Sequence, residues 1–268
     1  MGTSSSSSGP GSGLPLDPPW LEYLMSNVIP GAGALNTPIP PLESSPERRF
    51  FGARTNLGKY GNSGSSESLR RALGHYSKNG YGGSKNLASR MRVSSAVGAG
   101  IFGLLDGARS QTSGNAYQWL SDLQSKSLSC YEVADKIAES LMKIGGSLDE
   151  ESCRNSVALS IGEFLDTNPN TDLCNLTDDQ IWGVIQSFIS YEALHRIELD
   201  IGQMFESSEV SVTDKVLRLN EMHDYLKSSI AAHVEEIRGT YQNPSLQQVF
   251  DIINKSIEDT FYVFEGEI

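Results

Sequence analysis

The stretch TDDQIWGVIQSF, residues 177–188, carries the two signals that start a helix. Thr177 is a residue type whose side chain caps a helix N-terminus, and Gln180, three positions later, completes a capping box. Apolar residues follow directly, so the stretch predicts a helix from Thr177 that extends to about Phe205. A long helix of this kind needs apolar partners, and the sequence around it supplies them.

The neighbouring segments repeat their apolar residues at steps of three and four, the spacing of one helix face. The repeat predicts helices over Tyr131–Ile144 and Leu148–Leu165, which Gly145 and Gly146 separate as a stop and a turn. After Pro244, a last helix is predicted with one apolar stripe, formed by Leu246, Val249, Phe250, Ile253, Ile257, Phe261 and Phe264. No stretch alternates like a strand, so the fold class is predicted to be all-α, with a helical bundle as the body.

Residues 212–237 repeat apolar positions at alternating steps of four and three, which is the spacing of a coiled-coil-like seam. The members of this seam are Val212, Val216, Leu219, His223, Leu226, Ile230, His233 and Ile237. Histidines on an apolar seam are typical of buried, hydrogen-bonded rings. The seam therefore predicts one more long helix, with structural histidines.

Residues 47–114 are rich in glycine and in basic side chains. Two helices are nonetheless predicted there, Glu67–Lys78 after the capping serines Ser65 and Ser66, and Leu87–Leu105 after Ser84. The second prediction is opposed by glycines, each of which costs a helix roughly 1 kcal/mol relative to alanine.

Three of these glycines lie in GAGIFG, residues 98–103, which matches the spacing of a dinucleotide fingerprint. That motif works only where a strand enters the glycine turn and a helix leaves it. The flanks here are predicted to be helical. We therefore interpret the glycines as a helix face that allows close helix packing.

Residues 1–46 hold nine of the eleven prolines and few aliphatic side chains before Trp20. Such a segment buries too little apolar surface to offset the entropy of ordering, so it predicts a disordered Ser/Gly/Pro-rich arm. Within it, LDPPWLEYLM (16–25) places an apolar cluster beside the stiff Pro18-Pro19 pair. We interpret this cluster as an anchor that docks the arm on the body or on a partner, and the alternative is an incidental apolar patch.

The net charge of -12 hides two regions of opposite sign. Residues 1–119 carry 11 Lys+Arg against 6 Asp+Glu, a net charge of +5, whereas residues 120–268 carry 10 against 27, a net charge of -17. We therefore divide the chain into the flexible arm (1–46), a basic Gly-rich helical segment (47–114) and an acidic helical bundle (115–268). The basic segment meets an acidic partner or nucleic acid, or lies on the acidic half of the same chain.

Aromatic side chains interleave with the basic ones over residues 48–109. Cations beside aromatic rings suit phosphate contact and base stacking. The candidate contacts are Arg70, Arg71, Arg90 and Arg92. A nucleic-acid-binding adaptor is therefore one hypothesis, and internal neutralisation by the acidic half is the other.

Several classes of protein have no support in the sequence. No apolar run is long enough for a membrane span, and the start lacks the basic and apolar regions of a secretory signal. Cys130, Cys153 and Cys174 lie in separate segments, which predicts reduced thiols in a cytoplasmic protein. Nucleophile elbows, phosphate loops and helical histidine pairs do not occur, so we expect a protein that is not an enzyme and holds no metal or resident cofactor.

Three stretches together resemble the QatB family of the four-gene Qat anti-phage system. They are MGTSSSSSGP at 1–10, LDPPW at 16–20 and GYGGSKNLASRMR at 80–92, followed by the acidic helical half. The resemblance implies a bacterial, cytoplasmic protein of phage defence. It also implies partners, namely a QueC-like protein called QatC, an ATPase and a TatD-like nuclease.

The resemblance gives the start of the chain a chemical role. QueC-like enzymes use ATP to activate the carboxylate of 7-carboxy-7-deazaguanine, and such an activated acid needs an amine. The small Gly2 permits removal of Met1 and exposes an α-amine, which at a reference pKa of about 7.7 to 8.0 is partly neutral and nucleophilic. Gly2 is thus the expected modification site, carrying a 7-deazaguanine amide, and the expected partner contacts are Gly2, Thr3, Ser4, Ser5, Pro18, Pro19, Trp20 and Leu21.

Overall fold

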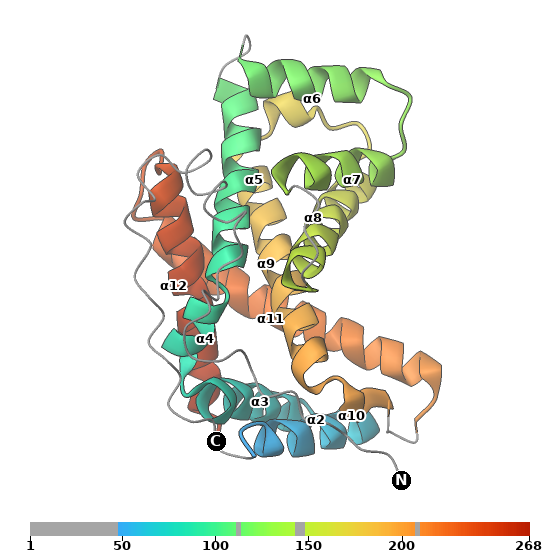
Figure 1. Cartoon of the computed structure of the whole chain (residues 1–268), viewed down its shortest axis with the longest axis vertical. Coiled ribbons are helices and arrows are strands. Elements are labelled where there is room, and N and C mark those ends of the chain that lie inside the picture. Colours follow the sequence, from blue (N-terminus) through green and yellow to red (C-terminus); the bar gives the residue numbers. More distant parts are fainter. Residues whose placement is uncertain (1–47, 111–113, 143–147, 207–209) are drawn as a thin grey trace.

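A computed structural model describes residues 48–110, 114–142, 148–206 and 210–268. These residues form helices joined by short connections and contain no strand, so the predicted all-α class is confirmed (Figure 1). The predicted arm, 1–46, and the Gly145-Gly146 turn lie outside the described residues. The α-helices are α2 (Phe51–Ser63), α3 (Ser66–His75), α4 (Ser84–Arg90), α5 (Arg92–Ser110), α6 (Asn115–Ser125), α7 (Cys130–Leu141), α8 (Leu148–Thr167), α9 (Asp178–Ile201), α10 (Gln203–Glu206), α11 (Val212–Arg238) and α12 (Leu246–Glu265).

The central helix is α9, which begins as the sequence predicts. The Thr177 hydroxyl accepts a hydrogen bond from the Gln180 backbone N–H at 3.2 Å, and the Gln180 side chain accepts one from the Thr177 N–H at 2.8 Å. The helix ends at Ile201 rather than at about Phe205, and the short α10 follows. It packs against α5, α8 and α11, so apolar residues are buried around most of its circumference (Figure 1).

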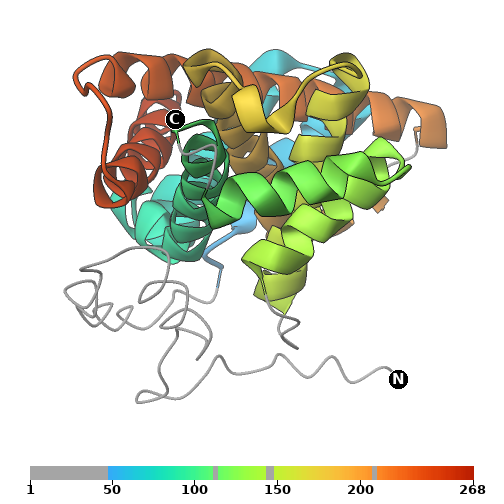
Figure 2. The same ribbon diagram turned by 90° about the horizontal axis from the view of Figure 1, so that it is seen from above.

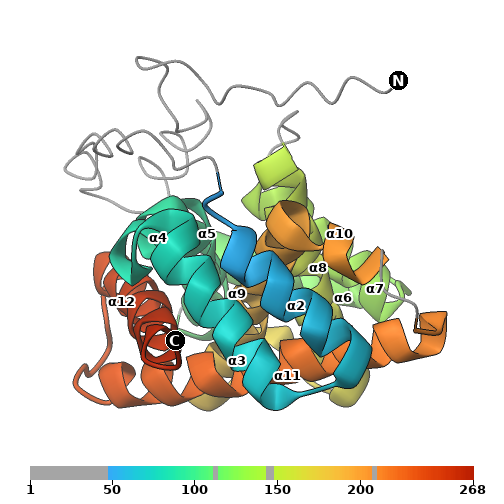
Figure 3. The same ribbon diagram turned by 90° about the horizontal axis from the view of Figure 1, so that it is seen from below.

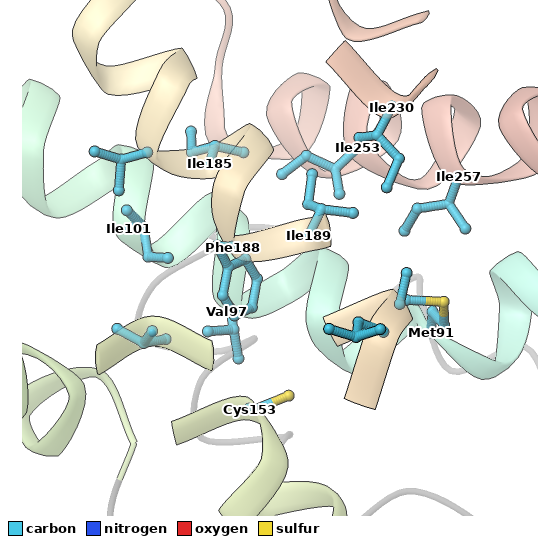
Figure 4. Packing of buried hydrophobic residues seen from close by; sticks show 14 of the residues in the cluster. Met91, Val97, Ile101, Cys153, Ile185, Phe188, Ile189, Ile230, Ile253 and Ile257 are labelled. Carbon is cyan, nitrogen blue, oxygen red and sulfur yellow. The ribbon is translucent and has the colours of Figure 1, made fainter. Parts of the chain in front are cut away.

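The helices on either side of α9 match their predictions closely. The predicted Tyr131–Ile144 and Leu148–Leu165 are α7 and α8, and the last predicted stripe is the buried face of α12. All of these helices contribute to one hydrophobic core that runs from Phe50 to Phe264. A close view shows side chains of α5, α9, α11 and α12 meeting at its centre (Figure 4). The basic and acidic segments therefore share a core.

The basic segment contains breaks that its sequence pattern did not reveal. The predicted Leu87–Leu105 is split into α4 and α5 at Met91, whose backbone leaves the helical region while its side chain is buried in the core (Figure 4). The cap of α4 is Gly83 rather than Ser84. Likewise, α3 starts after Ser65 as predicted but ends at His75, where a π-helix (η2, Tyr76–Tyr81) takes over.

Helix α2 was missed because three glycines interrupt its apolar pattern. Its buried face consists of Ala53, Leu57, Tyr60 and Gly61, and it packs on α3. The two helices lie side by side across one end of the molecule, joined at Gly64, which adopts the left-handed conformation with φ of 68° (Figure 3).

The glycines of the GAGIFG stretch bring α5 and α12 close together, as predicted. A Cβ atom on Gly98 would lie 2.7 Å from the Cδ1 atom of Ile253. Both flanks of the stretch are helical, because it lies inside α5. The dinucleotide interpretation is thus excluded by the local structure. Viewed from above, α5 and α12 lie against one another (Figure 2).

The predicted seam of α11 is only half buried. Its second half packs on α9 and α12 through Met222, His223, Leu226, Ile230 and Val234. Its first turns extend past α9, and the side chains of Val212 and Val216 are 78% and 52% exposed (Figure 1). The spacing predicted a helix correctly, but it could not show where the neighbouring helices end.

The seam histidines are structural, as predicted. The buried His223 ring shares a hydrogen bond of 3.0 Å with the Ser190 hydroxyl and stacks on the Tyr191 ring. The half-buried His233 ring lies 2.9 Å from the Ser229 carbonyl oxygen and 3.2 Å from the Thr260 hydroxyl.

Within the described part of the chain, no helix is both long and apolar enough to cross a lipid bilayer.

Two glycine-to-alanine substitutions should change stability in opposite directions. On Gly74 of α3, a Cβ atom would collide with the backbone carbonyl oxygen of Phe264, whereas on Gly58 of α2 nothing lies within 4 Å. Gly74→Ala should lower the free energy of unfolding by about 1–3 kcal/mol, because a backbone atom cannot easily move away. Gly58→Ala should raise it by about 0.5–1 kcal/mol. Urea unfolding followed by circular dichroism measures both, and equal effects would contradict the close crossing of α3 and α12.

Acidification should weaken the fold through His223. Burial first, and then the nearby Lys227, lower the pKa of His223 below its ordinary value of 6.5. The unfolded chain therefore takes up this proton first, so the free energy of unfolding falls as the pH drops from about 6.5 through the lower folded pKa. His223→Gln should flatten this slope in urea unfolding at several pH values. An unchanged slope in His223→Gln would show that other groups cause the pH dependence.

Candidate functional site

A polar cluster in the core surrounds the carboxylate of Glu192 on α9, a side chain only 2% exposed. One oxygen, Oε2, accepts hydrogen bonds from the Ser94 hydroxyl at 2.7 Å and the Cys153 thiol at 3.0 Å. The other, Oε1, accepts from the Ser156 hydroxyl at 2.7 Å and the Ser152 hydroxyl at 3.1 Å. Four donors from α5 and α8 thus satisfy one buried carboxylate.

The cluster continues to a histidine through Ser156, which is fully buried. The Ser156 oxygen lies 2.9 Å from Nδ1 of His195, one turn after Glu192 on α9. A serine–histidine–acid triad of hydrolases has the imidazole between the hydroxyl and the carboxylate. Here the hydroxyl lies between the other two groups, so the arrangement differs from that of a hydrolase triad.

The Cys153 thiol is also unsuited to attack a substrate. Burial, and next the charge of Glu192, raise the pKa of Cys153 well above its ordinary value. The side chain lies beside Val97 inside the core, and all three cysteines of the chain are free of disulfides (Figure 4). A thiol that stays protonated and inaccessible acts as a packing and hydrogen-bonding group.

A cavity of about 330 Å³ opens beside this cluster. It lies between α8 and α9 and is lined by Glu151, Ser152, Asn155, His195, Glu198 and Leu199. Ser152 and His195 therefore belong to both the cavity wall and the buried cluster. Burial raises the pKa of Glu198, while the nearby His195 acts in the opposite direction.

A second cluster lies where the described chain begins, and we call it the arm-base cluster. The Arg49 guanidinium lies 4.6 Å from the centre of the Phe50 ring, and Phe50 stacks on Tyr76. The hydroxyls of Tyr76 and Tyr81 donate to Oδ2 of Asp200 at 2.8 and 2.6 Å. Because Asp200 belongs to α9, residues 49–50 are held on the central helix. Burial, and next Asp200, raise the pKa of Tyr81, so this hydroxyl remains a donor.

The predicted nucleic-acid contacts lie on three helices. Arg70 and Arg71 are neighbours on α3, whereas Arg90 ends α4 and Arg92 begins α5. Arg70 pairs with Glu267 at 3.6 Å, and Arg71 pairs with Glu67 at 2.8 Å. These two cations are thus neutralised within the chain, one of them by the acidic half. The nucleic-acid interface remains a prediction.

The predicted modification and partner residues all precede the described part of the chain. They are Gly2, Thr3, Ser4, Ser5, Pro18, Pro19, Trp20 and Leu21. Their predicted role therefore rests on the sequence alone. In the described ranges, no group of three or more His, Cys, Asp or Glu side chains is placed to hold a metal ion.

Sequence reasoning missed Glu192, His195 and Asp200. One signal was present, because Glu192 follows Ile185 and Phe188 at steps of seven and four, which places a carboxylate on the buried face of the predicted helix. A buried carboxylate requires donors. The sequence gave no means of choosing those donors, because Ser94 and Cys153 come from distant segments.

These observations define an all-α protein with a buried carboxylate at its centre and an aromatic cluster at the base of its N-terminal segment. Residues 82–264 match the family model described as Qat anti-phage system associated protein QatB. The chain belongs to the QatB family, and the resemblance noted in its sequence is confirmed. Membership gives it a role in anti-phage defence. Neither a curated protein nor a solved structure matches the chain.

The Glu192 cluster should be a main source of stability. Ser94→Ala removes one donor from a buried carboxylate, which should lower the free energy of unfolding by about 1–3 kcal/mol. The matched control is Ser228→Ala on the exposed face of α11, which should change it by less than about 0.5 kcal/mol. Urea unfolding measures both variants, and a Ser94→Ala protein as stable as the control would show that the cluster is energetically unimportant.

Proposed function

We propose that this protein presents its N-terminal glycine to a QueC-like partner, QatC, which attaches a 7-deazaguanine group to it during anti-phage defence. The arm 1–46 is the delivery segment, and the helical body is its support. The chain is thus the acceptor of the modification rather than the catalyst. Family membership supports the defence role, and the remainder rests on the chemistry of the first residues.

The observation that supports the proposal is the packing of the first described residues, which follow the arm, against the central helix. The arm-base cluster holds Arg49 and Phe50 against Tyr76 and Tyr81, which are bonded to α9. A segment that inserts into another protein loses conformational entropy on binding. This loss is smaller when the residues at which the segment joins the body are already held in place. Eighteen residues from Gly2 to Pro19 reach up to roughly 60 Å when extended, at about 3.3 Å each.

The proposed reaction is an acyl transfer. The partner joins the carboxylate of 7-carboxy-7-deazaguanine to AMP, releasing pyrophosphate from ATP. The neutral amine of Gly2 then attacks the carbonyl carbon, a C–N bond forms, and the C–O bond to AMP breaks. AMP leaves with the electron pair, and the amine loses its extra proton to water. The product is an amide, so no cofactor stays bound to the body.

One feature of the body agrees with an acceptor role, and another agrees with a cytoplasmic location. Ser156 and Cys153, the nucleophiles next to His195 and Glu192, are both buried. The unpaired, buried thiols of Cys153 and Cys174 suit a reducing compartment, and we propose a cytoplasmic location. The ATPase and the TatD-like nuclease of the Qat system are the further partners that we propose.

A substitution at the second residue tests the proposal. Gly2→Leu should retain Met1 and place the amine behind a bulky start, so both the modification and protection from phage should be lost while the body stays folded. Gly2→Ala should keep both, because alanine also permits removal of Met1. Gly9→Leu is the matched control, since it makes the same exchange within the arm but leaves the amine unchanged.

The measurement is intact mass spectrometry after co-expression with the QueC-like protein, together with a plaque assay. The expected result is one added 7-deazaguanine acyl group on the Gly2, Gly2→Ala and Gly9→Leu chains. A wild-type chain that always ends in an unmodified Gly2, with a Gly2→Leu variant that protects fully, would overturn the proposal.

A further inference from the structure

The cavity between α8 and α9 has a hydrogen-bonding polarity that the buried Glu192 imposes. A carboxylate has about four acceptor sites. All four are used here, by Ser94, Cys153, Ser152 and Ser156. Each surrounding hydroxyl must then point its single hydrogen inward, toward Glu192.

This inward direction of the hydroxyl hydrogens determines which hydrogen-bonding atoms the cavity wall presents to a ligand. The Ser152 hydroxyl donates to Glu192, so only its lone pairs remain for a ligand. The Ser156 hydroxyl also donates to Glu192, so its oxygen must accept from His195, and Nδ1 of His195 carries the hydrogen. Because Nδ1 lies against the buried Ser156 and His195 also lines the cavity, we assign the opposite edge of the ring to the cavity. In the neutral ring, Nε2 is then an acceptor.

The remaining wall adds acceptors and one apolar surface. Glu151 and Glu198 supply carboxylates. No arginine or lysine lines the cavity. Leu199, which is 57% exposed, supplies an apolar wall. Asn155 adds an amide with one acceptor oxygen and two donor hydrogens. Acceptors from two helices thus outnumber donors at a site that has an aliphatic side.

We propose that this cavity binds an alkylguanidinium group. A guanidinium carries five N–H donors in a planar fork and no acceptor, which complements a wall of carboxylates, an imidazole nitrogen and a hydroxyl lone pair. Its alkyl chain lies along Leu199. A volume of about 330 Å³ is at the lower end of the range for small-ligand sites, which suits a group of this size. The site is independent of Gly2 and lies within the residues matched by the family model.

The same chemistry exists in a free metabolite and in an arginine side chain of a protein. Agmatine and an acetylated, amidated Gly-Arg-Gly peptide are therefore the two probes, and pentylurea is the uncharged control. Isothermal titration into the full-length protein measures each. We expect one saturable site for at least one cationic probe and none for pentylurea. The tighter of the two probes identifies the source of the group.

Substitutions connect binding to the cavity. Glu198→Gln removes a charge from the wall with little change in shape and should weaken binding about tenfold or more, since a charge-assisted hydrogen bond is lost. Glu236→Gln on the exposed face of α11 changes the net charge equally and should leave affinity unchanged. Loss of affinity in both variants would show general charge attraction and overturn the site.

Nitrogen NMR of the His195 ring gives an independent readout of the bonding direction. The free protein should show hydrogen on Nδ1, and agmatine should shift the Nε2 resonance as it begins to accept a hydrogen bond. Hydrogen on Nε2 in the free protein would overturn the assigned polarity. No saturable heat with either cationic probe up to about 10 mM would overturn the proposal as a whole.

Discussion

The carboxylate of Glu192 connects three helices of the body, because it lies on α9 and its hydrogen-bond donors lie on α5 and α8. A charge buried to this degree is tolerated only with donors on every side, so α5 and α8 must each place side chains within hydrogen-bond distance of α9. Apolar packing alone would let these helices slide along one another at small cost. Directional bonds from both neighbours fix their register, and the positions of His195 and of the α8–α9 cavity follow from that register.

Local signals in the sequence predicted the helices well where capping and spacing agreed. The start of α9 was correct because Thr177 and Gln180 bond to each other without help from the rest of the protein. The break at Met91 was not visible, because the tertiary position of that side chain in the core decides it. Helix α2 was missed for a related reason, since its glycines are tolerated through packing on α3.

The candidate sites were harder to predict from the sequence than the helices were. Gly2 could be proposed from sequence because its chemistry depends on the terminal amine and not on neighbours. The cavity could not, because its acceptors lie on two helices and their hydrogen-bond direction depends on Ser156, a residue without distinction in the sequence. The sequence left internal neutralisation and outside partners as alternatives for the basic segment, and Arg70 with Glu267 gives one pair between the two halves. Complementary charge within a chain reduces what is available to outside partners.

The packing of α12 on α3, α4 and α5 has a consequence for synthesis on the ribosome. The Asn254 side chain bonds to the Ala88 carbonyl across 166 residues, and Ser77 bonds to Glu265 across 188. At roughly 5–20 residues per second, the early helices wait on the order of 10–40 seconds for the helix that covers them. During that interval, the apolar side chains of α3, α4 and α5 that later contact α12 are exposed. Chaperones can bind these side chains, or they can associate with other chains. A chain that stops before α12 is made would therefore leave the first helices without their packing partner, in addition to lacking the last helix.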